Sequence, residues 1–420
     1  MIQEKSNRSP LLTIFLTVFI NLLGVGIVIP VIAPLLLVPT HDMLPADMSQ
    51  ETRSIILGFL IASFPLAQFF GAPILGALSD RYGRKKFLAL SIFGTLIGYL
   101  LFAYAIVIHD IYLLFFSRIL DGFTGGNISI AFSAISDLST EKTKAKNFGL
   151  IGAAFGLGFI LGPYMGGKLA DPHLISWFNA ATPFWFAAGL TALNLVFVFV
   201  SFPETLKEKN KTPVSLFTGI YNINTAFQLK HLRIIFLVVF LFTLGWNFFT
   251  QFFSVFLIHK FEYKDFSQIA NIFAFIGIWI VVAQGGLQRP LTKKYSSLKI
   301  IKVTALLIGI TLPMLLFPSS TQVFYIFYIL PFVSVFQGLT QPNLTAVVSD
   351  QVGEKDQGQI LGINQSIQSL GMAIPPIIAG YIHTLHPNLP IIVACVCTII
   401  GWLVLVLFFK TKKEKHAFEK

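Results

Sequence analysis

Arg118 and Asp121 are the residues whose types and spacing most directly suggest chemistry. They lie in the run "LFFSRILDG" (residues 114–122), inside a long apolar stretch. Residues three apart share one face of an α-helix, so the two charges can pair. If the stretch crosses a bilayer, each charge costs about 2.5–3.5 kcal/mol on insertion scales. We expect Asp121 to bind and release a proton and Arg118 to respond to its charge. A permanently ionised structural pair is the alternative.

The composition of the chain indicates that this stretch does cross a membrane. The sequence is 55% hydrophobic and 12% charged, whereas a soluble domain is about one-quarter charged. Apolar runs of about 20 residues or more recur along it, each enough to cross a hydrocarbon core of about 30 Å. The runs do not alternate with period two, so they predict helices rather than a barrel.

The expected fold is an all-α polytopic membrane protein with 12 transmembrane helices in two pseudo-symmetric six-helix halves. We expect spans near 11–39, 54–77, 87–108, 111–137, 147–170, 180–202, 232–258, 266–288, 299–317, 322–349, 359–382 and 389–410. This divides the chain into an N-terminal half (1–202), a cytoplasmic central loop (203–231) and a C-terminal half (232–420).

The distribution of basic residues predicts the orientation of the spans. Most of the 30 Lys and Arg residues fall in alternate loops, a set that includes both termini and the central loop. Because basic loops stay in the cytoplasm, both termini are expected there. The first apolar run is too long for a cleavable signal. We therefore expect a multi-pass protein of the plasma (inner) membrane.

Several classes of function are not expected. The net charge is +11, but the basic residues alternate with spans and form no aromatic-laced patch for nucleic acid. Cys395 and Cys397 share one apolar run without nearby His or carboxylate residues, so no metal site or cofactor is expected. No phosphate-binding loop, catalytic triad or segment long enough for an extramembrane domain is present, which argues against an enzyme or receptor.

The stretch "GALSDRYGRKK" (residues 76–86) concentrates charge between two expected spans. Gly76 and Gly83 permit tight turns and close backbone approach. We expect Asp80 to accept hydrogen bonds from free N–H groups at the cytoplasmic start of the following helix.

Asp137 is the expected partner of this stretch. It ends an expected span, where the helix dipole makes a negative charge unfavourable. It therefore needs a cation, and Arg81 or Arg84 lies on the same side of the membrane. The alternative is that the basic cluster only fixes the topology.

The run "GFILGPYMGG" (residues 158–167) has small residues at helical spacing. Gly158, Gly162 and Gly166 are four apart, which lets helices approach closely. Pro163 removes a backbone hydrogen bond and bends the helix, and Gly167 ends the run. Plain helix packing would explain this spacing without any transport role.

Neutral polar residues recur on the faces of the expected spans, in a chain with 44 Phe residues. Aromatic cavities with few polar anchors suit amphipathic ligands. We expect a small-molecule pocket near the midplane between the halves, lined by Asn21, Gln68, Trp246, Asn247, Gln251, Gln337, Gln341, Asn364 and Gln368.

The two halves are related by an internal repeat. The segment "SDLSTEKTKAKNFGLIG" from Ser136 aligns with "SDQVGEKDQGQILGINQ" from Ser349, and Pro163 aligns with Pro376. Two parallel six-helix repeats with a path between them are typical of transporters. In the second half, Lys293 and Lys294 replace the Asp-Arg pair of the first, so the second copy is expected to be the weaker.

Four motifs together resemble the major facilitator superfamily: residues 76–86, 114–122, 158–167 and "NLLGVGIVIPVIAPLL" at 21–36. The last resembles tetracycline-efflux-like drug:proton antiporters. The resemblance implies that Gly76, Asp80, Arg81, Gly83, Arg84 and Asp137 form a cytoplasmic latch between the halves. It also implies that residues 158–167 are an antiporter motif. Relatives carry an acid where this chain has Asn21, which shifts the expected proton site to Asp121.

This resemblance implies an antiporter that expels amphipathic small molecules, driven by proton entry through alternating access. The expected partners are a small-molecule substrate, protons and the lipid bilayer, with the protein a monomer and no cofactor. The alternative is a carrier of the same superfamily for a specific metabolite, such as a siderophore, sugar or organic acid, in either direction.

Overall fold

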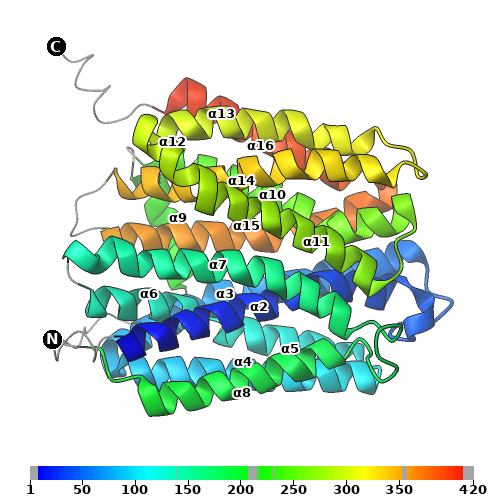
Figure 1. Ribbon diagram of the computed structural model, residues 1–420, viewed down its shortest axis with the longest axis horizontal. Coiled ribbons are helices and arrows are strands. Elements are labelled where there is room, and N and C mark those ends of the chain that lie inside the picture. Colours follow the sequence, from blue (N-terminus) through cyan, green and yellow to red (C-terminus); the bar gives the residue numbers. More distant parts are fainter. Residues whose placement is uncertain are drawn as a thin grey trace. The chain divides into compact units, whose positions relative to one another are not determined.

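The computed structural model describes residues 8–139, 141–206, 215, 217–229, 232–351 and 357–409. These residues are mostly helical and contain no strand (Figure 1). The chain forms two compact units. The N-terminal unit comprises Met1–Thr218 with Tyr263–Ala274, and the C-terminal unit comprises Gly219–Glu262 with Phe275–Lys420. The all-helical fold predicted from the sequence is confirmed.

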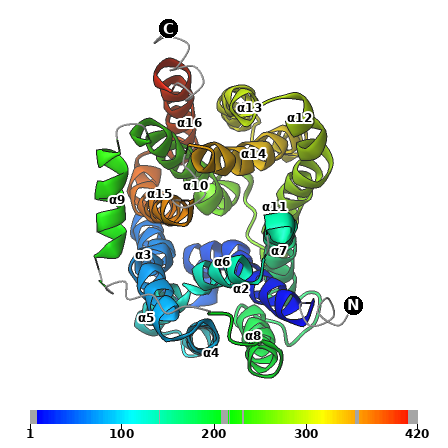
Figure 2. The same cartoon turned by 90° about the vertical axis from the view of Figure 1, so that its left-hand side faces the viewer.

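The N-terminal unit consists of long helices joined by short turns. They are α2 (Arg8–Leu37), α3 (Gln50–Tyr82), α4 (Arg84–Val107), α5 (Ile111–Thr124), α6 (Asn127–Leu138), α7 (Glu141–Leu169) and α8 (Thr182–Ser201), with the short η1 (Pro39–His41) after α2. Figure 2 views these helices end-on. Their core contains buried aliphatic side chains such as Ile14, Leu88 and Ile130.

The predicted fourth span is interrupted, because α5 ends at Thr124 and α6 begins at Asn127. Gly125 and Gly126 separate the two helices. A Cβ atom on Gly126 would lie 3.0 Å from the Cα of Ala72 in α3. The break therefore occurs where the backbones of two helices come close together, and glycine is what permits that approach.

Arg53 stabilises the turn between α2 and α3 through hydrogen bonds to its backbone. Its side chain is 1% exposed, and its guanidinium donates to the carbonyl oxygens of Leu36 (2.8 Å), Leu44 (3.3 Å) and Met48 (3.2 Å). A buried cation thus replaces missing backbone partners across the turn.

The C-terminal unit has the same helical character. Its helices are α9 (Thr218–Gln228), α10 (Arg233–Phe261), α11 (Phe266–Val281), α12 (Gln288–Lys294), α13 (Ser297–Thr311), α14 (Ile326–Ser349), α15 (Gln357–Leu385) and α16 (Leu389–Phe408), with the short π-helix η2 (Val282–Leu287) and the short 3-10 helices η3 (Leu312–Leu316) and η4 (Val323–Tyr325). The first residues of α11, as far as Ala274, group with the N-terminal unit.

The central segment 203–231 contains the helix α9, which differs from the loop expected there. Ile223 and Ala226 pack into the core of the C-terminal unit, whereas Tyr221 and Phe227 are exposed. Figure 2 shows that α9 runs across the other helices of its unit. The apolar residues that give α9 one apolar face cover a short segment and alternate with polar residues. The sequence pattern therefore did not predict this helix.

Nine helices within the described ranges are long and apolar enough to cross a membrane. The remaining predicted spans coincide with the broken pair α5–α6, with α7 and with α15. The basic residues of the expected cytoplasmic termini and of part of the central segment, among them Lys5, Lys207 and Lys413, lie outside the described residues.

Candidate functional site

Arg118 and Asp121 form a buried ion pair on α5. Arg118 Nη1 and Asp121 Oδ2 are 3.4 Å apart, and the two side chains are 6% and 4% exposed. The guanidinium carbon lies 4.5 Å from the ring centre of Phe64 on α3, within the range of a cation–π interaction. The predicted pairing of these two residues on one helix face is therefore what the structure contains.

Small residues make the space for this pair. A Cβ atom on Gly98 of α4 would lie 2.8 Å from the Cβ of Asp121. The neighbouring Tyr99 is buried, and its hydroxyl reaches Gly24 of α2. Arg118 Nε has no hydrogen-bond partner in the described part of the chain. The pair is thus enclosed by helices of the N-terminal unit, and one donor of the guanidinium is left over.

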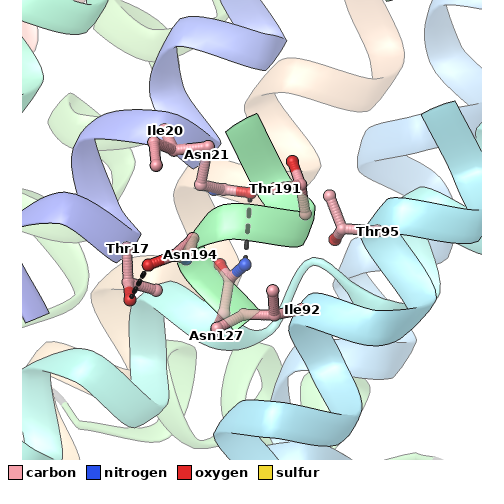
Figure 3. A pocket seen from close by; sticks show the side chains of 8 residues that line it. All are labelled: Thr17, Ile20, Asn21, Ile92, Thr95, Asn127, Thr191 and Asn194. Carbon is pink, nitrogen blue, oxygen red and sulfur yellow. Dashed lines mark hydrogen bonds between the residues drawn. The ribbon is translucent and has the colours of Figure 1, made fainter. Parts of the chain in front are cut away.

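A second group of polar side chains surrounds a small cavity between α2, α4, α6 and α8 (Figure 3). Thr17 donates to Asn194 Oδ1 (3.1 Å), and Asn127 Nδ2 donates to Asn21 Oδ1 (3.3 Å). The cavity has room for about one water molecule. Asn21, predicted to line the substrate pocket, lines this cavity inside the N-terminal unit.

Arg84 is the centre of a second charged cluster, at the end of α3 and the start of α4. Its side chain is 8% exposed, and its Nε lies 3.1 Å from Asp137 Oδ2 at the end of α6. Nη1 pairs with Asp80 and donates to Ser79 Oγ at 2.8 Å. Of the two predicted partners of Asp137, the structure selects Arg84.

The start of α4 is capped by a residue that sequence reasoning missed. Glu204 Oε1 accepts from the backbone N–H of Arg84 (2.8 Å), and Oε2 accepts from that of Lys85 (3.2 Å). Asp80 does not cap this helix, because it lies in the last turn of α3 and its carboxylate faces Arg84. The sequence feature that could have indicated this cap is the position of Glu204 directly after an expected span, in "FPET" at 202–205.

The remaining residues of the loop have different surroundings. Gly83 has a φ of 118°, a conformation that favours glycine and turns the chain between the two helices. Gly76 faces Ser129 of α6, whose Oγ would lie 3.6 Å from a Cβ atom. Arg81 is exposed, with its guanidinium 5.2 Å from the ring centre of Tyr82. The described contacts of Arg84 all lie within the N-terminal unit, and a latch between the halves stays a prediction.

The glycine run of α7 packs against α2. Cβ atoms built on Gly158 and Gly162 would lie 2.6 Å from Leu22 Cβ and 2.7 Å from the Leu23 carbonyl oxygen. Gly166 is similarly placed, 2.5 Å from the oxygen of Ile27. Pro163 lies against Gly26, whose own Cβ atom would come within 2.8 Å of the proline ring. The four-residue spacing therefore builds a close helix–helix contact, as its geometry predicts.

Gly167 faces a different neighbour, the first turn of α11. A Cβ atom there would collide with the backbone of Phe266 and the side chain of Ala270. The adjacent Lys168 donates to Ser267 Oγ at 2.6 Å. The end of the glycine run thus joins α7 to the start of α11, both within the N-terminal unit.

Three further residues predicted to line a substrate pocket, Gln68, Asn247 and Gln251, make contacts that do not depend on a ligand. Gln68 Nε2 donates to the carbonyl oxygen of Gly125 (3.1 Å), at the break between α5 and α6. In the C-terminal unit, Gln251 Nε2 donates to Asn247 Oδ1 (2.7 Å) and to the carbonyl oxygen of Met372 (3.2 Å).

Other predicted pocket residues lie on three helices of the C-terminal unit. Half-buried Trp246 is 5.4 Å from Phe249 between ring centres. The pairs Gln337–Gln341 on α14 and Asn364–Gln368 on α15 are each four residues apart, so each pair shares a helix face. A common pocket for these residues and those of the N-terminal unit stays a prediction.

The described ranges hold no group of three or more His, Cys, Asp or Glu side chains that could bind a metal ion. Cys395 and Cys397 are both buried free thiols.

Residues 14–376 and 290–420 match the family described as the Major Facilitator Superfamily. The chain belongs to the major facilitator superfamily. It is 28% identical over 389 residues to the class H tetracycline resistance protein of Pasteurella multocida, covering 90% of each chain. It is 29% identical over 413 residues to multidrug resistance protein 2 of Bacillus subtilis, covering 95% of each. The solved D-xylose–proton symporter has a TM-score of 0.78 at 15% identity, with 97% of this chain and 98% of that chain covered.

Membership of the major facilitator superfamily confirms the family predicted from the four motifs. The protein is an integral, multi-pass membrane transporter of small molecules and not an enzyme. The structural likeness to the symporter shows the fold alone, because the identity is low.

Proposed function

We propose that this transporter exports amphipathic small molecules in exchange for protons. The observation that carries the proposal is the buried pair of Arg118 and Asp121, 3.4 Å apart in the N-terminal unit. A carboxylate in so poorly solvated a site is costly unless a cation compensates it. Taking up a proton removes the charge of Asp121 and leaves Arg118 without its partner. Protonation and deprotonation of Asp121 therefore change the electrostatic interactions among α3, α4 and α5.

The curated relatives support the export direction and the substrate class. Two of them are named for resistance to tetracycline and to multiple drugs, and each matches at least 90% of the chain. Resistance by a transporter requires that the compound leave the cell. The half-buried Trp246 offers aromatic surface, and the pairs Gln337–Gln341 of α14 and Asn364–Gln368 of α15 offer a few neutral polar anchors, which suit amphipathic ligands.

The proposal includes the cellular setting of the transporter. The bias of basic residues supports a plasma (inner) membrane protein with both termini in the cytoplasm. We take the functional unit to be a monomer with alternating access, in which the Arg84 cluster stabilises the cytoplasmic end of the N-terminal unit.

Transport into proteoliposomes with an imposed pH gradient tests the proposal. Addition of a transported drug or dye should move protons across the membrane, and Asp121→Asn should abolish this movement while substrate binding persists. Asp47→Asn is the matched control, since Asp47 is an exposed acid in the turn between α2 and α3. Proton-coupled transport at the unchanged rate in Asp121→Asn would show that another group carries the proton.

The alternative is a superfamily carrier for a specific metabolite. The D-xylose–proton symporter has the same fold, so the fold does not separate the two functions. The same liposomes decide between them. Proton movement with a single siderophore, sugar or organic acid, and with no drug or dye, would favour the metabolite carrier.

A further inference from the structure

The polar cavity between α2, α4, α6 and α8 contains three buried polar atoms without a close hydrogen-bond partner in the described residues, although the Thr95 hydroxyl also interacts with Asp121. They are Asn21 Nδ2, Thr95 Oγ1 and Asn127 Oδ1. The three side chains are at most 4% exposed, and all three line this cavity (Figure 3). Buried polar groups without partners are costly, so three in one cavity indicate a bound polar ligand.

The hydrogen-bonding character of these atoms identifies the ligand. The amides of Asn21 and Asn127 bond to each other at 3.3 Å. Exchanging N and O in both amides keeps that bond, and one N–H group and one carbonyl oxygen still remain free. The ligand must therefore accept from one amide and donate to the other. A metal cation cannot do this, because it would face the free N–H group.

The size of the cavity limits the ligand further. It has room for about one water molecule, and buried waters commonly make about three hydrogen bonds to otherwise unpaired groups. We propose that the cavity is a binding site for a single ordered water molecule that bridges Asn21, Thr95 and Asn127. Thr17 and Asn194 complete the wall but already bond to each other.

The location of this site gives the water a mechanical role. Asn127 is the first residue of α6, directly after the break at Gly125 and Gly126. The water therefore ties the free end of the broken span to α2 and α4. Thr95 lies in the same helical turn as Gly98, against which Asp121 packs. The water site thus joins the half of the span that follows the break to the helix that supports the ion pair.

A double-mutant cycle on Thr95→Val and Asn127→Leu tests the bridge in the full-length protein in detergent. No direct bond joins these two side chains, so coupling between them has to pass through the water or through the shared cavity wall. The solvent peak described below separates these two routes. Each single substitution should lower the melting temperature by about 2–4 °C. The double variant should fall by clearly less than the sum, and an additive result would overturn the proposal.

Thr304→Val is the matched control for the cycle. Thr304 is equally buried and bonds to Thr340 in the C-terminal unit at 2.7 Å. Combined with Asn127→Leu, it should act additively. Coupling of the same size in this control pair would mean that the cycle reports general instability, and the proposal would fail.

Two further measurements distinguish water from other occupants. An experimental map that resolves ordered solvent should show one peak within hydrogen-bond distance of all three atoms, and no peak with the amides unmoved would overturn the proposal. Melting in sodium chloride and in potassium chloride should be the same. A sodium-specific rise that Asn127→Leu abolishes would indicate a cation site instead.

Discussion

Arg118 pairs with Asp121 across a single helical turn of α5, at 3.4 Å, with the arginine also under the ring of Phe64. Because both charges are buried, each depends on the other. Arg118→Ala should destabilise the N-terminal unit by about 3–5 kcal/mol, the usual cost of leaving one buried charge unpaired. Thermal unfolding in detergent measures this loss.

The double variant Arg118→Met with Asp121→Leu is the control for that loss. It removes both charges and keeps apolar volume, so most of the stability should return while proton-coupled transport does not. A double variant as unstable as Arg118→Ala would mean that the guanidinium acts through packing on Phe64 rather than through its charge.

The two arginines of the loop at residues 76–86 should differ in their effect on stability. Arg84→Ala removes the contacts with Asp80, Asp137 and Ser79 and should cost about 1–3 kcal/mol. Arg81→Ala is the matched control, because this exposed residue contacts only the neighbouring Tyr82 ring among the interactions described above. Equal melting temperatures for the two variants would contradict the assignment of Arg84 as the partner of Asp137.

Substitutions of Glu204 should weaken the cap at the start of α4 by graded amounts. Glu204→Ala removes both acceptors at the start of α4 and should cost about 0.5–2 kcal/mol. Glu204→Gln keeps one acceptor and should cost less. The order wild type, Gln, Ala in melting temperature is the expected result, and hydrogen exchange of the Arg84 and Lys85 amides should rise in the same order.

The glycine run of α7 should tolerate no added methyl group where it meets α2. In Gly162→Ala the new carbon would lie 2.7 Å from the Leu23 carbonyl oxygen, and overpacking of this kind costs about 1–3 kcal/mol. Gly189→Ala on α8 is the control, because its Cβ atom would meet nothing within 4 Å. That control should be neutral or stabilising, since alanine favours a helix by about 0.5–1 kcal/mol over glycine.

A pH effect is expected at the turn between α2 and α3. The His41 ring lies 4.9 Å from that of Phe266, and burial lowers the pKa of His41 below its usual 6.5 although Asp42 acts in the opposite direction. The folded state thus favours neutral His41. The contribution of neutral His41 to the stability of the fold is complete above about pH 6.5. This contribution is lost as the pH falls towards the lowered pKa.

Thermal unfolding between about pH 8 and pH 5 measures this effect. His41→Phe keeps a ring against Phe266 and should remove part of the acid-dependent fall in melting temperature. His109→Asn is the control, because His109 is exposed and asparagine tolerates its left-handed backbone. An acid dependence that is the same in wild type and His41→Phe would show that His41 does not contribute.

The spans could be predicted from the sequence because the lipid bilayer permits few kinds of segment to cross it. A bilayer requires each crossing segment to be apolar and to satisfy its own backbone hydrogen bonds, so length and composition almost determine the helices. The break at Gly125 and Gly126 was not predicted. Paired glycines also occur in continuous packed helices, so the pair alone does not predict the break that the structure has between Thr124 and Asn127.

The contacts of the charged loop were only partly predictable. The sequence identified Asp137 as an acid in need of a cation, but Arg81 and Arg84 were equivalent in the pattern. The choice depends on the turn at Gly83, whose positive φ directs the following residue back towards α3 and α6. Glu204 was missed because its partners lie 120 and 119 positions earlier in the chain, and local spacing carries no information about such contacts.

The long separation between Glu204 and Arg84 has a consequence for biosynthesis. Chains enter the membrane from the N-terminus, so α4 is made well before the residue that caps it. Until α8 has been made and the ribosome has passed residue 204, the start of α4 remains without its acceptor. Chains truncated before Glu204 should therefore leave this end open to protease, and chains that extend past it should close it. The contact of Glu204 with α4 can therefore form only after the whole segment from α4 to α8 has been made.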